Sequence, residues 1–155
     1  MPTRTMRRTA SQNRYFHPDF HCALNCGLNY LYGHYGAEAV TAYLWRFAAE
    51  FYAPLSEAIC ERGLAALREH LARIYSVEGV DIELLSSEAQ LTVSVPWCPA
   101  LKRIRERGET VCPVFVETTR TVNHAICDPT PYVFELRSYD ATTGSSVQRF
   151  ARRPS

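Results

Sequence analysis

The sequence predicts an α+β fold: a helical N-terminal half followed by a small antiparallel sheet with two helices. Up to about residue 79, apolar residues recur every three or four positions, as they do on one face of a helix. From Val80 onward they alternate along several short segments, as they do on one face of a strand. A length of 155 residues and an apolar fraction of 46% are ordinary for one domain with a buried core. We therefore expect a single domain over residues 15–155.

Four amphipathic helices are expected in the first half. The first begins at His17-Pro18, because a residue before proline avoids the helical conformation and proline suits the first helical position. Its apolar stripe ends at Tyr35, and the following Gly36 is a typical stop. The next three helices end at residues that stop a helix, namely Pro54, Gly63 and Gly79.

Aromatic side chains gather on the first two expected helices: Tyr30, Tyr32, Tyr35, Tyr43, Trp45, Phe47, Phe51 and Tyr52. Such a density lines an apolar ligand cavity, forms an interface between helices, or fills the core. The core is the commonest of these places and is the one we expect. An aromatic-rich pair of helices is also compatible with a homodimer.

The second half predicts two β-hairpins separated by two helices. Apolar residues alternate on both sides of a break at residues 86–88, namely Val80, Ile82 and Leu84, then Leu91, Val93 and Val95. Prolines begin the two helices, which we expect over residues 99–107 and 113–127. Strands over residues 132–139 and 145–152 close the chain, joined by a turn around Thr143-Gly144.

Charge and composition narrow the classes of partner. The net charge of +1 is unlike the concentrated basic surplus of nucleic-acid binders, and no apolar run approaches a membrane span. Residues 1–14 hold four arginines and no acid, and no apolar run follows them, so we expect a disordered basic arm rather than an export signal. We expect a cytoplasmic protein with a small-molecule partner, no nucleic-acid or membrane partner, and free thiols at its six cysteines.

Two Cys-Pro pairs are candidate reactive sites. Cys98-Pro99 follows an expected strand and Cys112-Pro113 precedes the next helix, so each cysteine is expected at a helix N-cap. Free backbone N–H groups and the helix dipole stabilise a thiolate there, which is the nucleophilic form of cysteine. The alternative is that each thiol fills a small apolar corner. Cys98 is the stronger candidate nucleophile because it lies at the end of a strand.

The helix expected over residues 113–127 carries Glu117, Arg120, His124 and Cys127 on one stripe, opposite an apolar side. An imidazole in a pocket could act as a general base, and a guanidinium could hold a carboxylate. The alternative is the solvated face of an ordinary amphipathic helix.

A metal site is a weaker hypothesis. His17 and His21 stand four residues apart, as do Cys22 and Cys26, and zinc accepts both nitrogen and sulfur ligands. We expect His17 to cap the first helix instead, and we expect no metal and no cofactor. The glycine patterns of nucleotide-binding folds, the Gly-x-Ser-x-Gly elbow and the His-Glu-x-x-His motif are absent from the sequence.

From about Leu91 onward the order of parts resembles the family of L-2-amino-thiazoline-4-carboxylic acid hydrolases. The resemblance rests on four features: the strand ending in Val95-Pro96-Trp97-Cys98-Pro99, the break at Arg107-Gly108, the helix closing at Cys127-Asp128, and the last strand pair around Thr143-Gly144. It covers about two-fifths of the chain and would carry over Cys98 and Cys127. A cysteine expected in the last strand is missing, since residues 147–150 read Val-Gln-Arg-Phe. The same arrangement also resembles the 4-vinyl-reductase-like small-molecule-binding domains.

The resemblance implies thiol-dependent hydrolytic opening of a cyclic amidine or thiazoline carboxylate. In this hypothesis the Cys98 thiolate attacks the C=N carbon, His124 shuttles a proton and Glu117 orients the imidazole. Arg120 binds the substrate carboxylate, with Cys112 as a further substrate-binding candidate and Cys127 as a further catalytic one. The rival hypothesis is a binding or sensory module that holds a small molecule in the same place without reacting with it.

Overall fold

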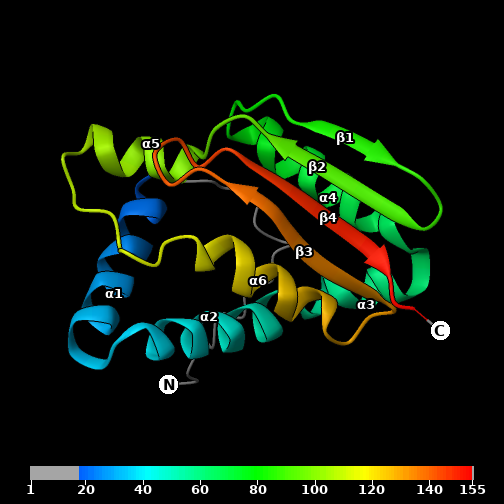
Figure 1. The fold of residues 1–155 in the computed structure, drawn as a ribbon, viewed down its shortest axis with the longest axis horizontal. Coiled ribbons are helices and arrows are strands. Elements are labelled where there is room, and N and C mark those ends of the chain that lie inside the picture. The colour runs from blue at the N-terminus through cyan, green and yellow to red at the C-terminus, as the bar shows by residue number, and fades with distance from the viewer. Residues whose placement is uncertain (1–17, 155) are drawn as a thin grey trace, which may run out of the picture.

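The computed structural model describes residues 18–154, so the expected basic arm over residues 1–14 and the expected cap at His17 lie outside the described part. The predicted α+β class is confirmed (Figure 1). Six helices and four strands follow one another along the described chain: α1 (Asp19–Tyr35), α2 (Ala37–Phe51), α3 (Ala53–Arg62), α4 (Leu64–Val77), β1 (Glu83–Ser86), β2 (Gln90–Val95), α5 (Pro99–Glu106), α6 (Glu117–Cys127), β3 (Tyr132–Tyr139) and β4 (Ser146–Arg152).

The four strands form one antiparallel sheet in the order β1-β2-β4-β3. Both predicted hairpins are therefore present, and the pairing of β4 with β2 joins them into one sheet. One face of the sheet is apolar and buried, with Leu91 and Val93 of β2 beside Phe150 of β4 and Phe134 of β3. The other face is polar, and there Arg149 Nε donates to the side-chain oxygen of Gln90 at 2.7 Å. The alternation of period two explains this division.

The helices cover the apolar face of the sheet and then extend past one end of it (Figure 1). One buried cluster joins that face to α3, α4 and α6, and its centre includes Ile59, Leu67 and Phe150. A second cluster joins α1, α2 and α5 through Leu28, Leu44 and Leu101. Figure 1 shows α6 between α2 and β3, so this helix has neighbours on two sides. No helix among residues 18–154 is both long and apolar enough to cross a membrane.

Several sequence-based boundaries are wrong. The first strand begins at Glu83, although the alternation that predicted it begins at Val80. The last helix begins at Glu117 and not at Pro113, because residues 113–116 form consecutive turns in which the Phe115 N–H bonds to the carbonyl oxygen of Cys112. Cys112 is therefore not a helix N-cap. The first helix begins at Asp19, with Pro18 in the capping position. Proline favours a helix start within about one turn, and the tertiary contacts decide which residue begins it.

The expectation that the N-terminal aromatic residues fill the core is wrong for most of them. Tyr30, Tyr35, Tyr43 and Trp45 are exposed, with Tyr35 at 67% of its free area, while Phe47 is half-buried. On α1 the buried positions are instead Cys22, Asn25 and Leu28, which face α5 and the loop before α6. The apolar stripe alone did not reveal which side of α1 has a neighbour in the described structure.

Candidate functional site

Cys98 lies at the N-cap of α5, as predicted, with extended backbone angles of φ −91° and ψ 119°. Its backbone N–H donates to the carbonyl oxygen of Thr143 at 2.9 Å, in the turn between β3 and β4. The Arg105 guanidinium also donates to this turn, reaching the carbonyl oxygens of Thr142 and Ala141. The start of α5 is thus held against the β3–β4 turn, which leaves Cys98 only partly exposed.

The surroundings of the Cys98 thiol favour its neutral form. Burial raises the pKa of this thiol above its ordinary value, and the nearby carboxylate of Glu78 acts in the same direction. The backbone N–H groups of Leu101 and Ala100 oppose this shift but do not reverse it. The predicted N-cap geometry is therefore present, whereas the depressed thiol pKa that a nucleophile needs is not.

The polar side chains of α6 form a local network near its N-terminus. Glu117 accepts hydrogen bonds from Arg120 Nη1 and from the Thr121 hydroxyl, both at 2.6 Å. His124 is exposed, and its ring meets the edge of the Phe134 ring at a centroid distance of 5.2 Å. Burial of part of the ring and the nearby Arg120 lower the pKa of His124. Within residues 18–154, no hydrogen bond or ring contact joins Cys98 to this network.

Cys127 does not share the solvated stripe with Arg120 and His124. It is 2% exposed and belongs to the core below the sheet, where burial raises the pKa of its thiol to about 12. Cys112 is also 2% exposed, and its backbone N–H donates to Asn25 Oδ1 at 2.9 Å. Cys127 is buried because α6 packs against both α2 and β3, which leaves only a narrow side of this helix facing solvent.

The residues of the alternative metal-site hypothesis are not grouped together in the described structure, because each has different surroundings. His21 Nε2 lies 2.8 Å from Glu78 Oε1, in a hydrogen bond between α1 and the end of α4. Cys22 is buried, and Cys26 is exposed. Among the described residues, which do not include His17, no three histidine, cysteine or acidic side chains are grouped as metal ligands.

A buried polar cluster beneath the sheet was not predicted from the sequence. Gln148 of β4 accepts a hydrogen bond from Asn123 Nδ2 at 3.2 Å and donates to the Ser146 hydroxyl at 3.1 Å. All three residues are at least nine-tenths buried. Burial raises the pKa of the nearby Tyr75 to about 12, and the Gln148 side chain acts in the opposite direction. The available signal was the alternation in β4, which places Ser146 and Gln148 on the same side as the apolar Phe150.

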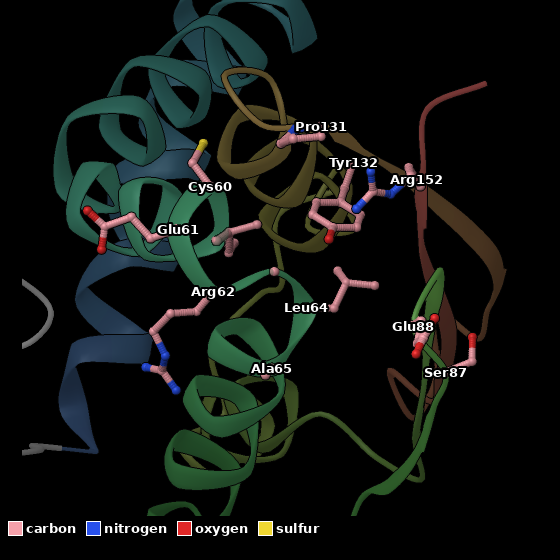
Figure 2. A pocket seen from close by; sticks show the side chains of 12 residues that line it. Cys60, Glu61, Arg62, Leu64, Ala65, Ser87, Glu88, Pro131, Tyr132 and Arg152 are labelled. Carbon is pink, nitrogen blue, oxygen red and sulfur yellow. The ribbon is translucent and has the colours of Figure 1, made fainter. Parts of the chain in front are cut away.

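A pocket of about 450 Å³ lies where α3 meets α4, facing the end of the sheet. Its wall combines four chain segments that are far apart in sequence: the end of α3 and start of α4, the β1–β2 turn, the start of β3 and the end of β4. Figure 2 shows Leu64, Tyr132 and Arg152 facing the opening, with Ser87 and Glu88 on the side of the β1–β2 turn. The lining residues are Ile59, Cys60, Glu61, Arg62, Gly63, Leu64, Ala65, Ser87, Glu88, Pro131, Tyr132 and Arg152.

Tyr132 and Arg152 are paired across β3 and β4, so both side chains project from the same side of the sheet. The Arg152 guanidinium lies over the Tyr132 ring, 5.7 Å from its centroid. The ring is 4% exposed, yet its hydroxyl has no hydrogen-bond partner within the described residues. Sequence reasoning missed both residues, although Arg152 stands two positions after Phe150 in β4 and so projects from the same side of the sheet.

Comparison with known proteins adds no assignment. No protein-family model matches the chain, and no curated protein matches its sequence significantly. The candidate function therefore depends on the residues and geometry described above.

Proposed function

We propose that this domain binds a small molecule in the pocket between α3, α4 and the end of the sheet. The observation that carries the proposal is the Tyr132 hydroxyl, which faces the pocket from a buried ring with no partner within residues 18–154. The Tyr132 hydroxyl is not itself enclosed, since the buried unpartnered side-chain atom among the described residues is Arg103 Nε. It can therefore bond to a ligand in the pocket without giving up an internal hydrogen bond. The volume of about 450 Å³ also lies within the range of small-molecule sites.

Binding fits this pocket better than catalysis does. Its lining includes no histidine, the side chain that most often acts as a general base near neutral pH. The one lining thiol, that of Cys60, donates to the carbonyl oxygen of Pro129 at 3.5 Å. The role in which a small molecule is held without reacting is also the one implied by the resemblance to 4-vinyl-reductase-like domains.

A pair of matched variants on α4 tests the proposal. Ala65 lines the pocket, whereas Ala72, two turns later on the same helix, is exposed outside it. Fragments that bind the wild-type protein in a thermal-shift screen are retested on Ala65→Trp and Ala72→Trp. We expect the indole at position 65 to abolish binding and the indole at position 72 to leave it unchanged. If the fragments bind both variants as they bind the wild-type protein, the ligand site lies elsewhere and the pocket is rejected.

Thiol-dependent hydrolysis at Cys98 is the second candidate function. One observation favours it: Cys98 is the N-cap of α5, where the backbone N–H groups of Leu101 and Ala100 act to lower the pKa of its thiol. A cyclic amidine or thiazoline carboxylate would be opened by attack of this sulfur on the C=N carbon, with cleavage of the ring bond from that carbon to nitrogen or sulfur. Water would then displace the Cys98 thiol and leave the ring-opened amide or urea. His124, Glu117, Arg120 and Cys127 would have to act from positions where no hydrogen bond or ring contact joins them to Cys98 within residues 18–154. Cys112 belongs to the buried apolar cluster against which Cys98 packs.

Turnover of 2-aminothiazoline-4-carboxylate decides between the two candidates. Hydrolysis by the wild-type protein that is lost in Cys98→Ala and kept in Cys26→Ala would establish the second function. Cys26 is the matched control because it is an exposed thiol on a different helix, α1. We expect no turnover by any of the three proteins, since the Cys98 thiol is held in its neutral form.

A further inference from the structure

We propose that the pocket recognises the anionic group of its ligand, a carboxylate or a phosphate, through the N-terminus of α4, the Tyr132 hydroxyl and the Arg152 guanidinium. The inference rests on the proposed binding function and specifies the ligand class. It is carried by three groups from different elements that meet at one wall of the pocket.

The first group is the N-terminus of α4, a helix of 14 residues. The first N–H groups of a helix have no partner within the helix, and its dipole favours negative charge at this end. Here the cap is Gly63, at φ 69°, so no side chain bonds to these groups, and the first turn contains no acidic residue. Gly63, Leu64 and Ala65 line the pocket, so this helix end opens directly into it.

The second group is the Tyr132 hydroxyl, which points at the same helix end. A Cβ atom built on Gly63 would lie 3.0 Å from this oxygen, so glycine is what leaves room for the hydroxyl beside the cap. Tyr132 is 4% exposed and packs in the core, and this burial fixes the position of its hydroxyl oxygen. With no partner within residues 18–154, the O–H is available to donate to an anion next to the first turn of α4.

The third group is the Arg152 guanidinium at the end of β4. It lies over the Tyr132 ring and has no ion pair among the described residues. Two acidic residues also line the pocket, Glu61 and Glu88. Figure 2 shows Glu61 directed away from Tyr132, and Glu88 on the β1–β2 turn across the opening. Arg62 is likewise directed away and is paired with Glu69 at 2.6 Å.

These three groups suit an oxyanion with two or three oxygens. They are the backbone N–H groups at the start of α4, the Tyr132 hydroxyl and the Arg152 guanidinium. The apolar side chains of Ile59 and Leu64 in the same pocket suit a hydrophobic body attached to that anion. The ligand class is therefore a small organic carboxylate or phosphate ester.

Matched probes separate the charge from the body of the ligand. Benzoate and phenyl phosphate carry an anion on an aromatic ring, benzamide and benzyl alcohol are their neutral counterparts, and inorganic phosphate is an anion without a body. Dissociation constants are measured by NMR titration, which also locates each probe from the shifted backbone signals. We expect the organic anions to bind at least about tenfold tighter than the neutral probes and to shift the signals of Gly63, Leu64 and Ala65.

Two variants test the side chains. Tyr132→Phe removes only the hydroxyl and Arg152→Gln removes only the charge, with Tyr35→Phe and Arg68→Gln as matched controls at exposed positions outside the pocket. We expect each pocket variant to weaken anion binding about five- to tenfold and to leave benzamide binding unchanged. Tyr132→Phe should leave the thermal midpoint of the free protein unchanged, because its hydroxyl makes no hydrogen bond within the described structure.

The possible outcomes separate the proposed anion subsite from the proposed binding of small molecules in the pocket. Equal affinity for charged and neutral probes, with binding blocked by Ala65→Trp, would reject the anion subsite and keep the pocket. No binding by any probe would reject both. A preference for phenyl phosphate over benzoate, or the reverse, identifies which of the two anions the subsite was built for, and binding by both supports the shared chemistry.

Discussion

Gly144 lies so close to Cys98 that any side chain at position 144 would collide with the Cβ atom of Cys98. A Cβ atom at Gly144 would also lie 2.9 Å from Cδ1 of Leu101, and the backbone at Gly144 has φ +70°. The backbone of the β3–β4 turn at Gly144 therefore packs directly against the side chains of Cys98 and Leu101 at the start of α5. This contact keeps the Cys98 thiol out of bulk solvent.

Gly144→Ala should destabilise the fold by about 2–5 kcal/mol, from the left-handed backbone together with the collision. The free energy of unfolding is measured by urea denaturation. The control is Gly33→Ala, where a Cβ atom meets nothing within 4 Å and the helix α1 should gain up to about 1 kcal/mol. Adding Cys98→Gly to Gly144→Ala should recover part of the loss, and a strictly additive double variant would contradict the described contact.

The six thiols should react with iodoacetamide in an order set by exposure and pKa. Cys26 and Cys60 are exposed and should be alkylated first, while Cys98 should react slowly at about pH 8 because its raised pKa leaves little thiolate. Cys127, with a pKa near 12, should react only on unfolding. Peptide mass analysis assigns each site. Rapid labelling of Cys98 below about pH 7 would reverse the expectation and favour the hydrolase.

Asn25 should contribute strongly to stability, because its buried side chain fixes the loop before α6. Its amide donates to the Thr110 carbonyl oxygen at 2.8 Å and accepts from the Cys112 N–H at 2.9 Å. Asn25→Ala leaves both backbone groups without this partner and should cost about 2–4 kcal/mol in unfolding free energy. Asn29 donates to the same carbonyl from a more exposed position, so Asn29→Ala should cost less than about 1 kcal/mol. Equal losses would mean that burial does not decide the effect.

Acidification should destabilise the protein through His70. Burial lowers the pKa of its imidazole from 6.5 to about 4, with the nearby Arg73 acting in the same direction, while its ring packs edge-on against Tyr52. The unfolded chain therefore binds a proton that the folded chain does not. The contribution of neutral His70 to the free energy of unfolding is full above pH 6.5 and is lost as the pH falls toward about 4. Urea midpoints measured across this range should decline less in His70→Gln than in the wild type.

The exposed His34→Gln variant is the control for this pH dependence, and its slope should match that of the wild type. A parallel decline in His70→Gln and the wild type would assign the acid sensitivity to other groups.

Local pattern was sufficient to predict the class of fold and most of its elements. The β3 range of residues 132–139 and the N-cap at Cys98 both agree with the structure, because period-two alternation and a Cys-Pro pair act within a few residues. The start of α6 was misplaced because Pro113 suits a turn as well as a helix. The core role given to Tyr30 and Tyr35 failed because periodicity shows an apolar side of a helix without showing what covers it.

The sequence by itself determined the α+β class, the two hairpins and the position of Cys98 at the start of a helix. Only the tertiary structure decided which groups meet. Among the described residues it left Cys98 without a hydrogen bond or ring contact to His124, buried Cys127, and brought Gly63, Tyr132 and Arg152 to one pocket. The physical reason is range: backbone preferences and side-chain alternation act between neighbours in the chain, whereas a pocket forms where segments distant in the chain pack together.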